Sequence, residues 1–270
     1  MRRQFMVYEK INLEEIFVNL PKTDRTAVAH VFLPEVYEEI GVNKVFPCVV
    51  LCPGGAYVFR SQREDEPTVL RFLGAGIAVV KVEYSCGPEG GHFPTQLLQV
   101  CAAIAMVRRN AEKWHIDSSK IAVMGYSAGG HLAASLSTLY SSDETRPDFQ
   151  ILLYPVISMV PGITHGGSRK NLLGDNPTKE LEDAYSLERR VSPRSPQAFI
   201  VLSADDGAVP PMNSIGYFLA LNQQKVPVSM HIYPIGGHGW GFRDNFTYKR
   251  QWTEELEKWL RDGVKFEKNN

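Results

Sequence analysis

The chain has 270 residues, of which 44% are hydrophobic and 22% are charged, and its formal net charge is −1. A protein of this size buries about three quarters of its unfolded surface and is close to the upper size for one hydrophobic core, so we expect a single domain over residues 1–270. The near-neutral charge argues against nucleic acid as a partner, because such binding needs an excess of positive charge.

The N-terminus lacks the features of a targeting signal. Residues 1–10 include Arg2 and Arg3 but not the apolar stretch of about 7 to 15 residues, or the small-residue cleavage site, of a secretory leader. No segment of the sequence is apolar over the length of a membrane span. We therefore expect a cytoplasmic protein with no membrane partner.

Cysteine spacing argues against a metal site or a disulfide framework. The sequence has no Cys-x-x-Cys pair and no histidine cluster at metal-ligand spacing. Most of the cysteines stand in apolar surroundings, so we expect buried free thiols. The cysteines are Cys48, Cys52, Cys86 and Cys101.

Apolar runs of strand length alternate with longer segments of helical periodicity along the chain. The predicted strands are 27–33, 45–52, 77–84, 121–124, 149–154, 198–203 and 228–233. The predicted helices are 67–74, 94–114, 128–140, 211–224 and 247–260. Because the central strands are almost continuously apolar, we expect them to be parallel and covered on both faces, which predicts a doubly wound α/β fold. The strands before the first clear helix are expected to form an antiparallel edge.

The segment 154–196 interrupts this alternation. It is rich in Gly, Pro and Ser, and its only helical stretch is short, at 179–185. A connection of this length is long for a plain loop, so we expect a lid or an excursion that faces the substrate.

The segment Gly125–Gly129 reads Gly-Tyr-Ser-Ala-Gly and stands between a predicted strand and a predicted helix. This is the context of a nucleophile elbow, in which a sharp strand-to-helix turn presents a serine hydroxyl. We expect the flanking glycines to permit the strained backbone and to leave the hydroxyl exposed. Ser127 is therefore the predicted nucleophile.

A nucleophilic serine needs a base, and the base needs an acid that fixes its tautomer. After an elbow serine the acid comes next in the chain and the histidine last. Asp205 and Asp206 follow the predicted strand 198–203, and His238, between two glycines, follows the strand 228–233. Both loops leave the carboxyl ends of strands, where doubly wound sheets bind their ligands. His238 is the predicted base, and either aspartate can be the acid.

Three segments together make the chain resemble the α/β-hydrolase superfamily, and within it the small acetyl esterase and acetylxylan-esterase-like group, which is related to the hormone-sensitive-lipase-like esterases. The segments are residues 52–57 (Cys-Pro-Gly-Gly-Ala-Tyr), residues 125–132 and the loops of Asp206 and His238. The resemblance implies an α/β-hydrolase fold with a mostly parallel sheet and small lid insertions. It also implies a serine esterase that needs no metal and no cofactor.

The same resemblance suggests an oxyanion hole. In this family a His-Gly-Gly-Gly type loop offers backbone amides to the developing oxyanion, and this chain has Pro53, Gly54, Gly55 and Ala56 in that place. The implied donors are the amides of Gly55, Ala56 and Ala128, with Gly54 allowing a close approach. Each such donor can contribute about 2.7 to 4 kcal/mol to catalysis.

Family spacing also chooses between the two aspartates. The triad acid stands in an Asp-x-x-Val-Pro pattern, which Asp206, Val209 and Pro210 satisfy. The resemblance thus implies Asp206 as the acid, and Asp205 as a neighbour that caps the loop.

Aromatic residues beside these motifs are candidates for substrate binding. Tyr57, Phe59, Tyr126 and Trp240 are predicted to line a pocket or to stack on a sugar ring, and the first, third and fourth are the foremost candidates. Because the insertions are modest, we expect a small-molecule ester with a short acyl group, acetyl foremost, on a carbohydrate or another small alcohol.

Three alternatives stay open at this level. A serine peptidase of the prolyl-oligopeptidase type usually carries an extra β-propeller, for which the chain is too short. A lipase would need a more apolar lid than 154–196 offers. A non-enzymatic ligand receptor on a hydrolase fold has typically lost a triad member. The sequence also leaves the oligomeric state open, a homo-oligomer included.

Overall fold

The computed structural model describes residues 6–21, 23, 27–36, 39, 41, 43–87 and 92–262. Residues 1–5, which include Arg2 and Arg3, lie outside the described residues. Within the described ranges, no helix combines the length and the apolar character needed to cross a membrane.

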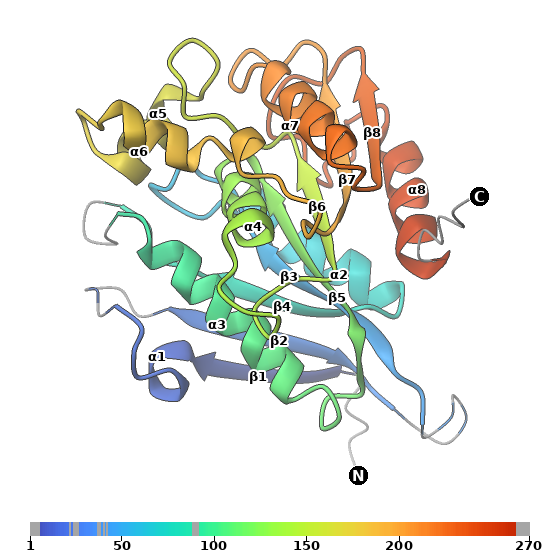
Figure 1. Cartoon of the computed structure of the whole chain (residues 1–270). Helices are drawn as coiled ribbons and strands as arrows, with labels where there is room; N and C mark the ends of the chain where they lie inside the picture. Colours follow the sequence, from blue (N-terminus) through green and yellow to red (C-terminus); the bar gives the residue numbers. More distant parts are fainter. Residues whose placement is uncertain are drawn as a thin grey trace.

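In the described part of the chain, eight strands form one sheet with the order β1-β2-β4-β3-β5-β6-β7-β8 (Figure 1). From β4 onward in that order all neighbours are parallel, whereas β2 is antiparallel to both β1 and β4. The predicted mostly parallel sheet with an antiparallel N-terminal edge is confirmed. The strands are β1 (Met6–Asn12), β2 (Val28–Pro34), β3 (Phe46–Cys52), β4 (Ala78–Glu83), β5 (Ile116–Tyr126), β6 (Phe149–Leu153), β7 (Gln197–Ser203) and β8 (Val228–Tyr233).

The antiparallel edge of the sheet consists of different strands from those expected. The segment 45–52 was expected at the antiparallel edge, but β3 lies inside the sheet, parallel to both β4 and β5. Its residues 48–52 are all buried, which an edge strand does not allow. The outermost strand is instead β1, whose side chains are mostly half-exposed, so the sequence carries little apolar signal there.

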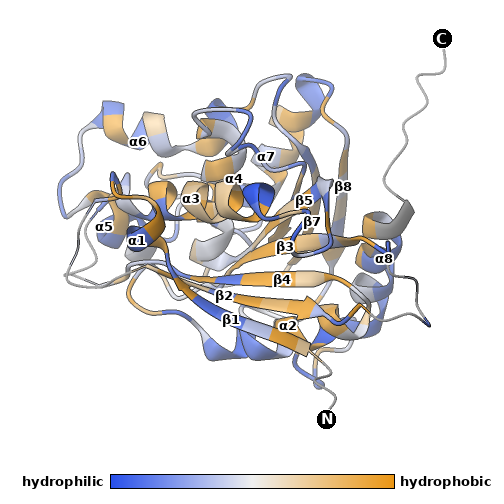
Figure 2. Cartoon of the chain, turned by 90° about the horizontal axis from the view of Figure 1, so that it is seen from below, coloured by the Kyte–Doolittle hydropathy of each residue, from blue (hydrophilic) through white to orange (hydrophobic). Residues whose placement is uncertain are grey.

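Helices cover both faces of the sheet (Figure 2). The helices α3 (Thr95–Arg109), α4 (Ser127–Leu139) and α7 (Met212–Gln223) lie on one face, with the short α1 (Leu13–Ile16) beside α3. The helices α2 (Glu66–Gly74) and α8 (Lys249–Asp262) lie on the other.

An ion pair links the two helices of the second face. The Arg71 guanidinium of α2 lies 2.5 Å from the Glu257 carboxylate of α8. Helix α8 buries Trp252, Leu256 and Leu260, which recur every four residues on its inner face. This spacing explains why the sequence predicts α8 well.

The predicted excursion 154–196 contains α5 (Gly166–Leu173), α6 (Lys179–Tyr185) and the 3-10 turn η4 (Leu187–Arg189). Helix α5 is not predicted from the sequence, because it begins with two glycines and has no clear apolar stripe. It is stabilised at its start by His165, whose Nδ1 accepts the N–H of Ser168 at 3.2 Å. In Figure 1, α5 and α6 lie together beyond the carboxyl end of β6.

The cysteines are buried thiols rather than disulfides, as predicted. Burial in apolar surroundings raises the pKa of the Cys101 thiol to about 12. Such thiols are inert side chains of the core rather than nucleophiles.

Candidate active site

Strand β5 turns directly into helix α4 at Ser127, without an intervening loop. Ser127 has φ +52°, in the left-handed region that residues with a side chain seldom adopt. Such strain persists only where the surroundings enforce it, and it is typical of functional turns. The residue is 7% exposed, so its hydroxyl is more covered than expected.

The glycines of the elbow permit the strained turn by leaving room for it. The left-handed conformation belongs to Ser127, and Gly125 and Gly129 do not share it. Neither glycine has space for a side chain. A Cβ on Gly125 would lie 2.0 Å from the Gly129 carbonyl oxygen, and one on Gly129 would lie 2.2 Å from the Cys52 carbonyl oxygen. The first turn of α4 therefore packs backbone to backbone against the end of β3.

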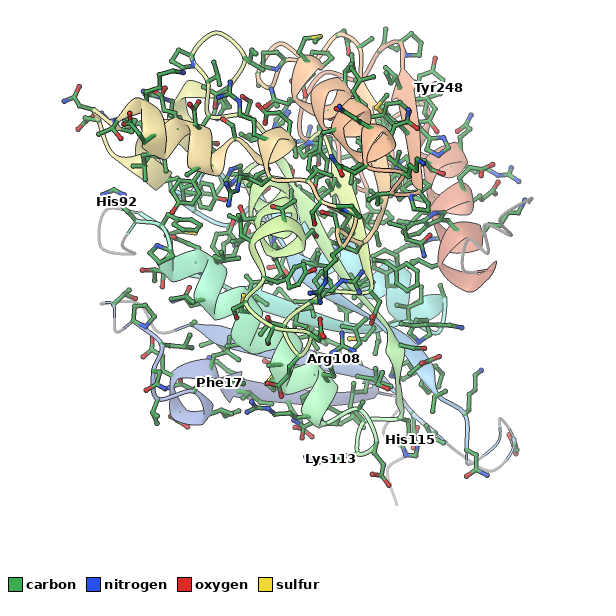
Figure 3. All side chains as sticks on the ribbon, in the orientation of Figure 1. Phe17, His92, Arg108, Lys113, His115 and Tyr248 are labelled. Atoms are coloured by element: carbon green, nitrogen blue, oxygen red, sulfur yellow. The ribbon has the colours of Figure 1, made fainter. Side chains whose placement is uncertain are left out.

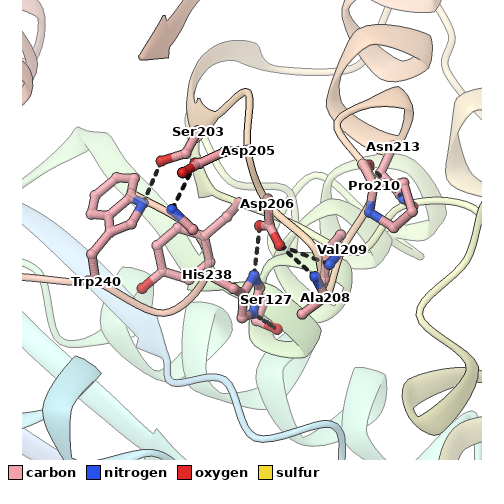
Figure 4. A network of polar contacts seen from close by, with 12 residues as sticks. Ser127, Ser203, Asp205, Asp206, Ala208, Val209, Pro210, Asn213, His238 and Trp240 are labelled. Carbon is pink, nitrogen blue, oxygen red and sulfur yellow. Dashed lines mark hydrogen bonds and ion pairs between the residues drawn. The ribbon is translucent and has the colours of Figure 1, made fainter. Parts of the chain in front are cut away.

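Ser127, His238 and Asp206 form one hydrogen-bonded chain (Figure 4). The Ser127 Oγ lies 2.8 Å from Nε2 of His238. The Nδ1 of His238 lies 2.7 Å from Oδ2 of Asp206. A carboxylate only accepts hydrogen bonds, so Nδ1 carries the proton and Nε2 is free to accept the serine proton.

Asp206 and Asp205 have separate partners. Asp206 is 7% exposed, and its Oδ1 accepts the N–H groups of Ala208 and Val209, both at 2.9 Å. Asp205 is exposed and accepts the N–H groups of Gly237 at 2.7 Å and Gly236 at 3.2 Å. These backbone bonds, the Gly237 bond first, lower the pKa of the Asp205 carboxyl. Asp206 is thus the aspartate that contacts the imidazole, while Asp205 holds the loop that carries it.

The predicted oxyanion loop follows β3 and lies against the elbow. Gly55 and Ala56 have φ +130° and +54°, and a Cβ on Gly54 would lie 3.0 Å from the Ser127 Cβ. Among the hydrogen bonds of the described residues, none is donated by the N–H of Gly55 or Ala56. Ala128 lies in the first turn of α4, where N–H groups have no acceptor within the helix. Three amides beside Ser127 are therefore free to donate to a ligand.

Three of the four aromatic residues predicted to bind substrate belong to the core, and only Phe59 of the four is exposed. Tyr57, Tyr126 and Trp240 are 2%, 0% and 3% exposed. The Tyr57 hydroxyl pairs with Nδ1 of His131 at 2.9 Å, and the Tyr126 hydroxyl pairs with Oγ1 of Thr68 at 2.8 Å. Trp240 donates its indole N–H to a buried serine and stacks on Phe246 with ring centroids 4.1 Å apart. Other protein atoms cover these three side chains, so they do not line a pocket as predicted.

The other histidines contribute no second triad. His115 precedes β5 and so lies at the opposite end of that strand from Ser127 (Figure 3). His92 donates from Nδ1 to the Asn171 carbonyl at 3.1 Å. His165 lies close to the site. Burial lowers the pKa of His165 most, and the nearby charge of His238 lowers it further.

Several residues of the site are not found from the sequence. Asn171 of α5 donates from Nδ2 to the Ala56 carbonyl at 2.9 Å, which ties the excursion to the oxyanion loop. Glu64 and Tyr154 lie buried beneath the loops of the site. Glu64 stands in a charged segment that resembles an exposed helix start, and Tyr154 ends an apolar strand, so neither carries a signal of its role.

The BD-FAE family model matches residues 35–221 of the chain. The chain is 36% identical over 235 residues to an acetylxylan esterase of Xylanibacter ruminicola, a match that covers 85% of this chain and 47% of that protein. It is 32% identical over 221 residues to endo-1,4-beta-xylanase B of Butyrivibrio fibrisolvens, covering 77% of this chain and 35% of that protein. The chain therefore spans less than half the length of these two relatives.

A solved structure covers nearly the whole chain. The acetyl ester-xyloside bifunctional hydrolase of Caldicellulosiruptor lactoaceticus superposes with a TM-score of 0.85 at 34% identity. The match covers 94% of this chain and 96% of the other. The similarity thus extends over all the layers described above.

Proposed function

Since the chain belongs to the BD-FAE family and is an esterase of the α/β-hydrolase superfamily, we propose that it hydrolyses short-chain acyl esters, acetyl esters foremost, through an acyl-enzyme on Ser127. The observation that carries the proposal is the hydrogen-bonded chain from Ser127 through His238 to Asp206. Free backbone amides lie beside its serine end. This combination is what acyl transfer requires.

In the first half of the reaction, Ser127 Oγ attacks the ester carbonyl carbon while Nε2 of His238 takes its proton. The carbonyl oxygen becomes an oxyanion and accepts hydrogen bonds from the amides of Gly55, Ala56 and Ala128. The Asp206 carboxylate stabilises the imidazolium that forms. His238 then gives the proton to the leaving alcohol as the bond between carbon and that oxygen breaks.

In the second half, a water molecule attacks the acyl carbon and His238 takes a proton from it. The same amides hold the second oxyanion. The bond to Ser127 then breaks, the serine oxygen recovers the proton from His238, and the carboxylic acid leaves. Asp206 keeps its charge throughout, since its role is to orient and stabilise the imidazole.

Acetylated carbohydrate is the proposed substrate class. One relative is named an acetylxylan esterase, and the other is named an acetyl ester-xyloside bifunctional hydrolase. With Tyr57, Tyr126 and Trp240 buried, exposed side chains near the site must meet the sugar. Phe59 of the oxyanion loop and Ile235 of the His238 loop are each 56% exposed. We propose that these two apolar surfaces contact the sugar ring.

Hydrolysis of p-nitrophenyl acetate tests the reaction. Ser127→Ala is expected to abolish turnover and labelling by a fluorophosphonate probe, which reacts only with an activated serine. Ser137→Ala is the matched control, because Ser137 is buried on the same helix and its hydroxyl donates only to the Ala133 carbonyl, at 2.9 Å. Equal rates for wild type and Ser127→Ala would remove Ser127 from the mechanism.

Two further measurements test the substrate class. Acetate release from acetylated xylo-oligosaccharides should exceed release from unrelated acetate esters. A series of p-nitrophenyl esters should show highest kcat/KM for the shortest acyl chains. Preference for acyl chains of about eight carbons or more would instead favour a lipase-like apolar acyl site. Phe59→Ala should raise KM for the oligosaccharide more than for p-nitrophenyl acetate.

A further inference from the structure

Glu64 is a carboxylate buried directly beneath the candidate active site. It ends the 3-10 turn η2 (Gln62–Glu64) and is 1% exposed. Its Oε2 accepts the N–H of Gly54 at 2.8 Å, and its Oε1 accepts the hydroxyl of Tyr154 at 2.9 Å. The Nε of Arg63, a side chain 45% exposed, lies 3.9 Å from Oε1. A buried carboxylate weakens folding unless its partners compensate, so its presence here calls for a reason beyond stability.

Tyr154 connects Glu64 to the loop of His238. Its hydroxyl accepts the N–H of Gly241 at 3.0 Å while donating to Glu64. Its ring lies edge-on against the His238 imidazole, with centroids 4.8 Å apart. Tyr154 has φ +37°, a strained value for a tyrosine. The surrounding structure holds it in this conformation, in contact with both the imidazole and the carboxylate.

The neighbours of Glu64 contact the remaining parts of the site. The Thr68 hydroxyl donates to the Glu64 carbonyl at 2.9 Å and pairs with the hydroxyl of Tyr126, the residue before Ser127. The Arg63 guanidinium lies against Gly239, where a Cβ would be 2.7 Å from Nη2. One short segment thus contacts the oxyanion loop, the elbow and the loop of His238.

We propose that Glu64 is a positioning residue for the reaction proposed above: its carboxylate holds Gly54 and, through Tyr154, the His238 loop in register with Ser127. This inference rests on the proposed function. The charged and titratable groups that face His238 are Asp206 after β7, Tyr154 after β6, His165 before α5, and Arg63 and Glu64 of η2. Of these, Glu64 is the carboxylate that the triad itself does not use.

The stability of a neutral variant separates this role from a structural one. Burial, the largest cause, raises the pKa of Glu64 above its ordinary value. When the pKa of a carboxyl is raised in the folded state, the free energy of unfolding of the protein falls as the pH rises through that pKa. The ionised form of Glu64 therefore destabilises the fold at neutral pH. A glutamine of the same shape can accept from Gly54 and donate to Tyr154. Glu64→Gln should therefore have an unchanged or higher Tm.

The experiment compares Glu64→Gln, Tyr154→Phe and the double variant on p-nitrophenyl acetate. Tyr217→Phe is the matched control, because Tyr217 is fully buried and donates its hydroxyl to the side chain of Gln150 at 2.9 Å, outside the site. For Glu64→Gln we expect kcat to fall by about tenfold to a hundredfold with little change in KM, because the neutral amide holds Gly54 and Tyr154 by weaker hydrogen bonds than the carboxylate does, so that the oxyanion donors and the imidazole are less firmly aligned.

The double variant tests the connection through Tyr154. If both residues act through one hydrogen bond, their combined loss of kcat should be smaller than the product of the single losses. Tyr217→Phe should lose Tm as Tyr154→Phe does but keep the wild-type kcat. Wild-type kcat in Glu64→Gln would overturn the inference, as would a loss of activity that only follows a loss of Tm. Absence of ester hydrolysis in the wild type would overturn the proposed function as well, whereas an active wild type with an unaffected Glu64→Gln overturns this inference alone.

Discussion

His131 and His238 each join a hydrogen-bonded system near the Ser127 turn, but their surroundings allow different chemistry. His131 is fully buried within α4; its Nε2 donates to the Tyr185 carbonyl at 3.0 Å, and its Nδ1 accepts the Tyr57 hydroxyl at 2.9 Å. Burial lowers its pKa to about 4. Both nitrogens are used by groups that cannot stabilise a positive charge as a carboxylate does.

The His238 side chain is 19% exposed and has a carboxylate on one side and a hydroxyl on the other. A proton taken at Nε2 creates a cation that Asp206 stabilises at once. The difference shows that an imidazole becomes a candidate base through a carboxylate partner and access to a reacting group. Nearness to the serine in sequence is not enough, since His131 is the closer of the two along the chain.

The sharpest test of this contrast removes the imidazole of each system in turn. His238→Ala is expected to lower kcat for p-nitrophenyl acetate by about 10⁵-fold or more, because the serine loses its base. His131→Asn should leave the triad intact, so its kcat is expected to stay near the wild-type value while its Tm falls. Steady-state kinetics and thermal unfolding of both variants give the comparison. A larger loss of kcat in His131→Asn would reverse the roles.

A second test concerns the carboxylate partner. Asp206→Asn is expected to lower kcat by about 10⁴-fold, because the amide favours the wrong imidazole tautomer and carries no charge. Asp205→Asn weakens only the bonds to Gly236 and Gly237, and we expect a loss of about tenfold or less. Measured kcat/KM values decide the assignment, since a larger effect at Asp205 would make it the acid.

A third test uses the pH dependence of stability and concerns His131, the buried histidine. The folded-state pKa of His131, about 4, lies below its ordinary value of 6.5. Its contribution to stability is therefore complete above pH 6.5 and is lost as the pH falls towards 4. At pH 5 this amounts to about 2 kcal/mol of unfolding free energy. Denaturant unfolding gives the free energy of unfolding of the wild type and of His131→Asn at pH 8 and at pH 5. The decrease from pH 8 to pH 5 should be smaller in His131→Asn by about 2 kcal/mol. Equal decreases in the two proteins would contradict a buried, neutral His131.

The smallest effect is expected at Tyr57. Tyr57→Phe removes the hydroxyl that pairs with His131, so we expect unfolding free energy to fall by about 1 kcal/mol. The ring stays in the core, and kcat and KM should remain close to wild type. A clear rise in KM for acetylated xylo-oligosaccharides would return Tyr57 to the substrate-binding residues from which its burial removes it.

Local patterning predicted most of the sheet and its covering helices. The strand 228–233 and the helix 179–185 are found where predicted, and most other elements begin or end within a few residues of the prediction. The misses have physical causes. The helix predicted over 94–114 ends at Arg109, and β1 has too few buried side chains to show an apolar pattern. The position of β3 inside the sheet depends on pairing with β4 and β5, which a local pattern does not encode.

The residues of the site likewise include some that the sequence predicts and some that it does not. Ser127 and His238 could be predicted because a sharp turn and a glycine-flanked loop restrict the residues that fit them. Burial of Tyr57, Tyr126 and Trp240 could not, because an aromatic residue beside a motif looks the same in sequence whether it faces a pocket or the core.

The sequence by itself determined the alternation of strands and helices, the serine at the end of β5 and the histidine after β8, because each depends on backbone conformation and side-chain size within a short segment. The family pattern implied Asp206 as the partner of that histidine, and the tertiary structure brings the two into contact. Only the tertiary structure decided which carboxylate lies beneath the oxyanion loop. Asp206 and His238 are 32 residues apart, and Glu64 and Tyr154 are 90 apart. Contacts over such separations arise from the packing of loops at the carboxyl ends of parallel strands, and no local pattern records them.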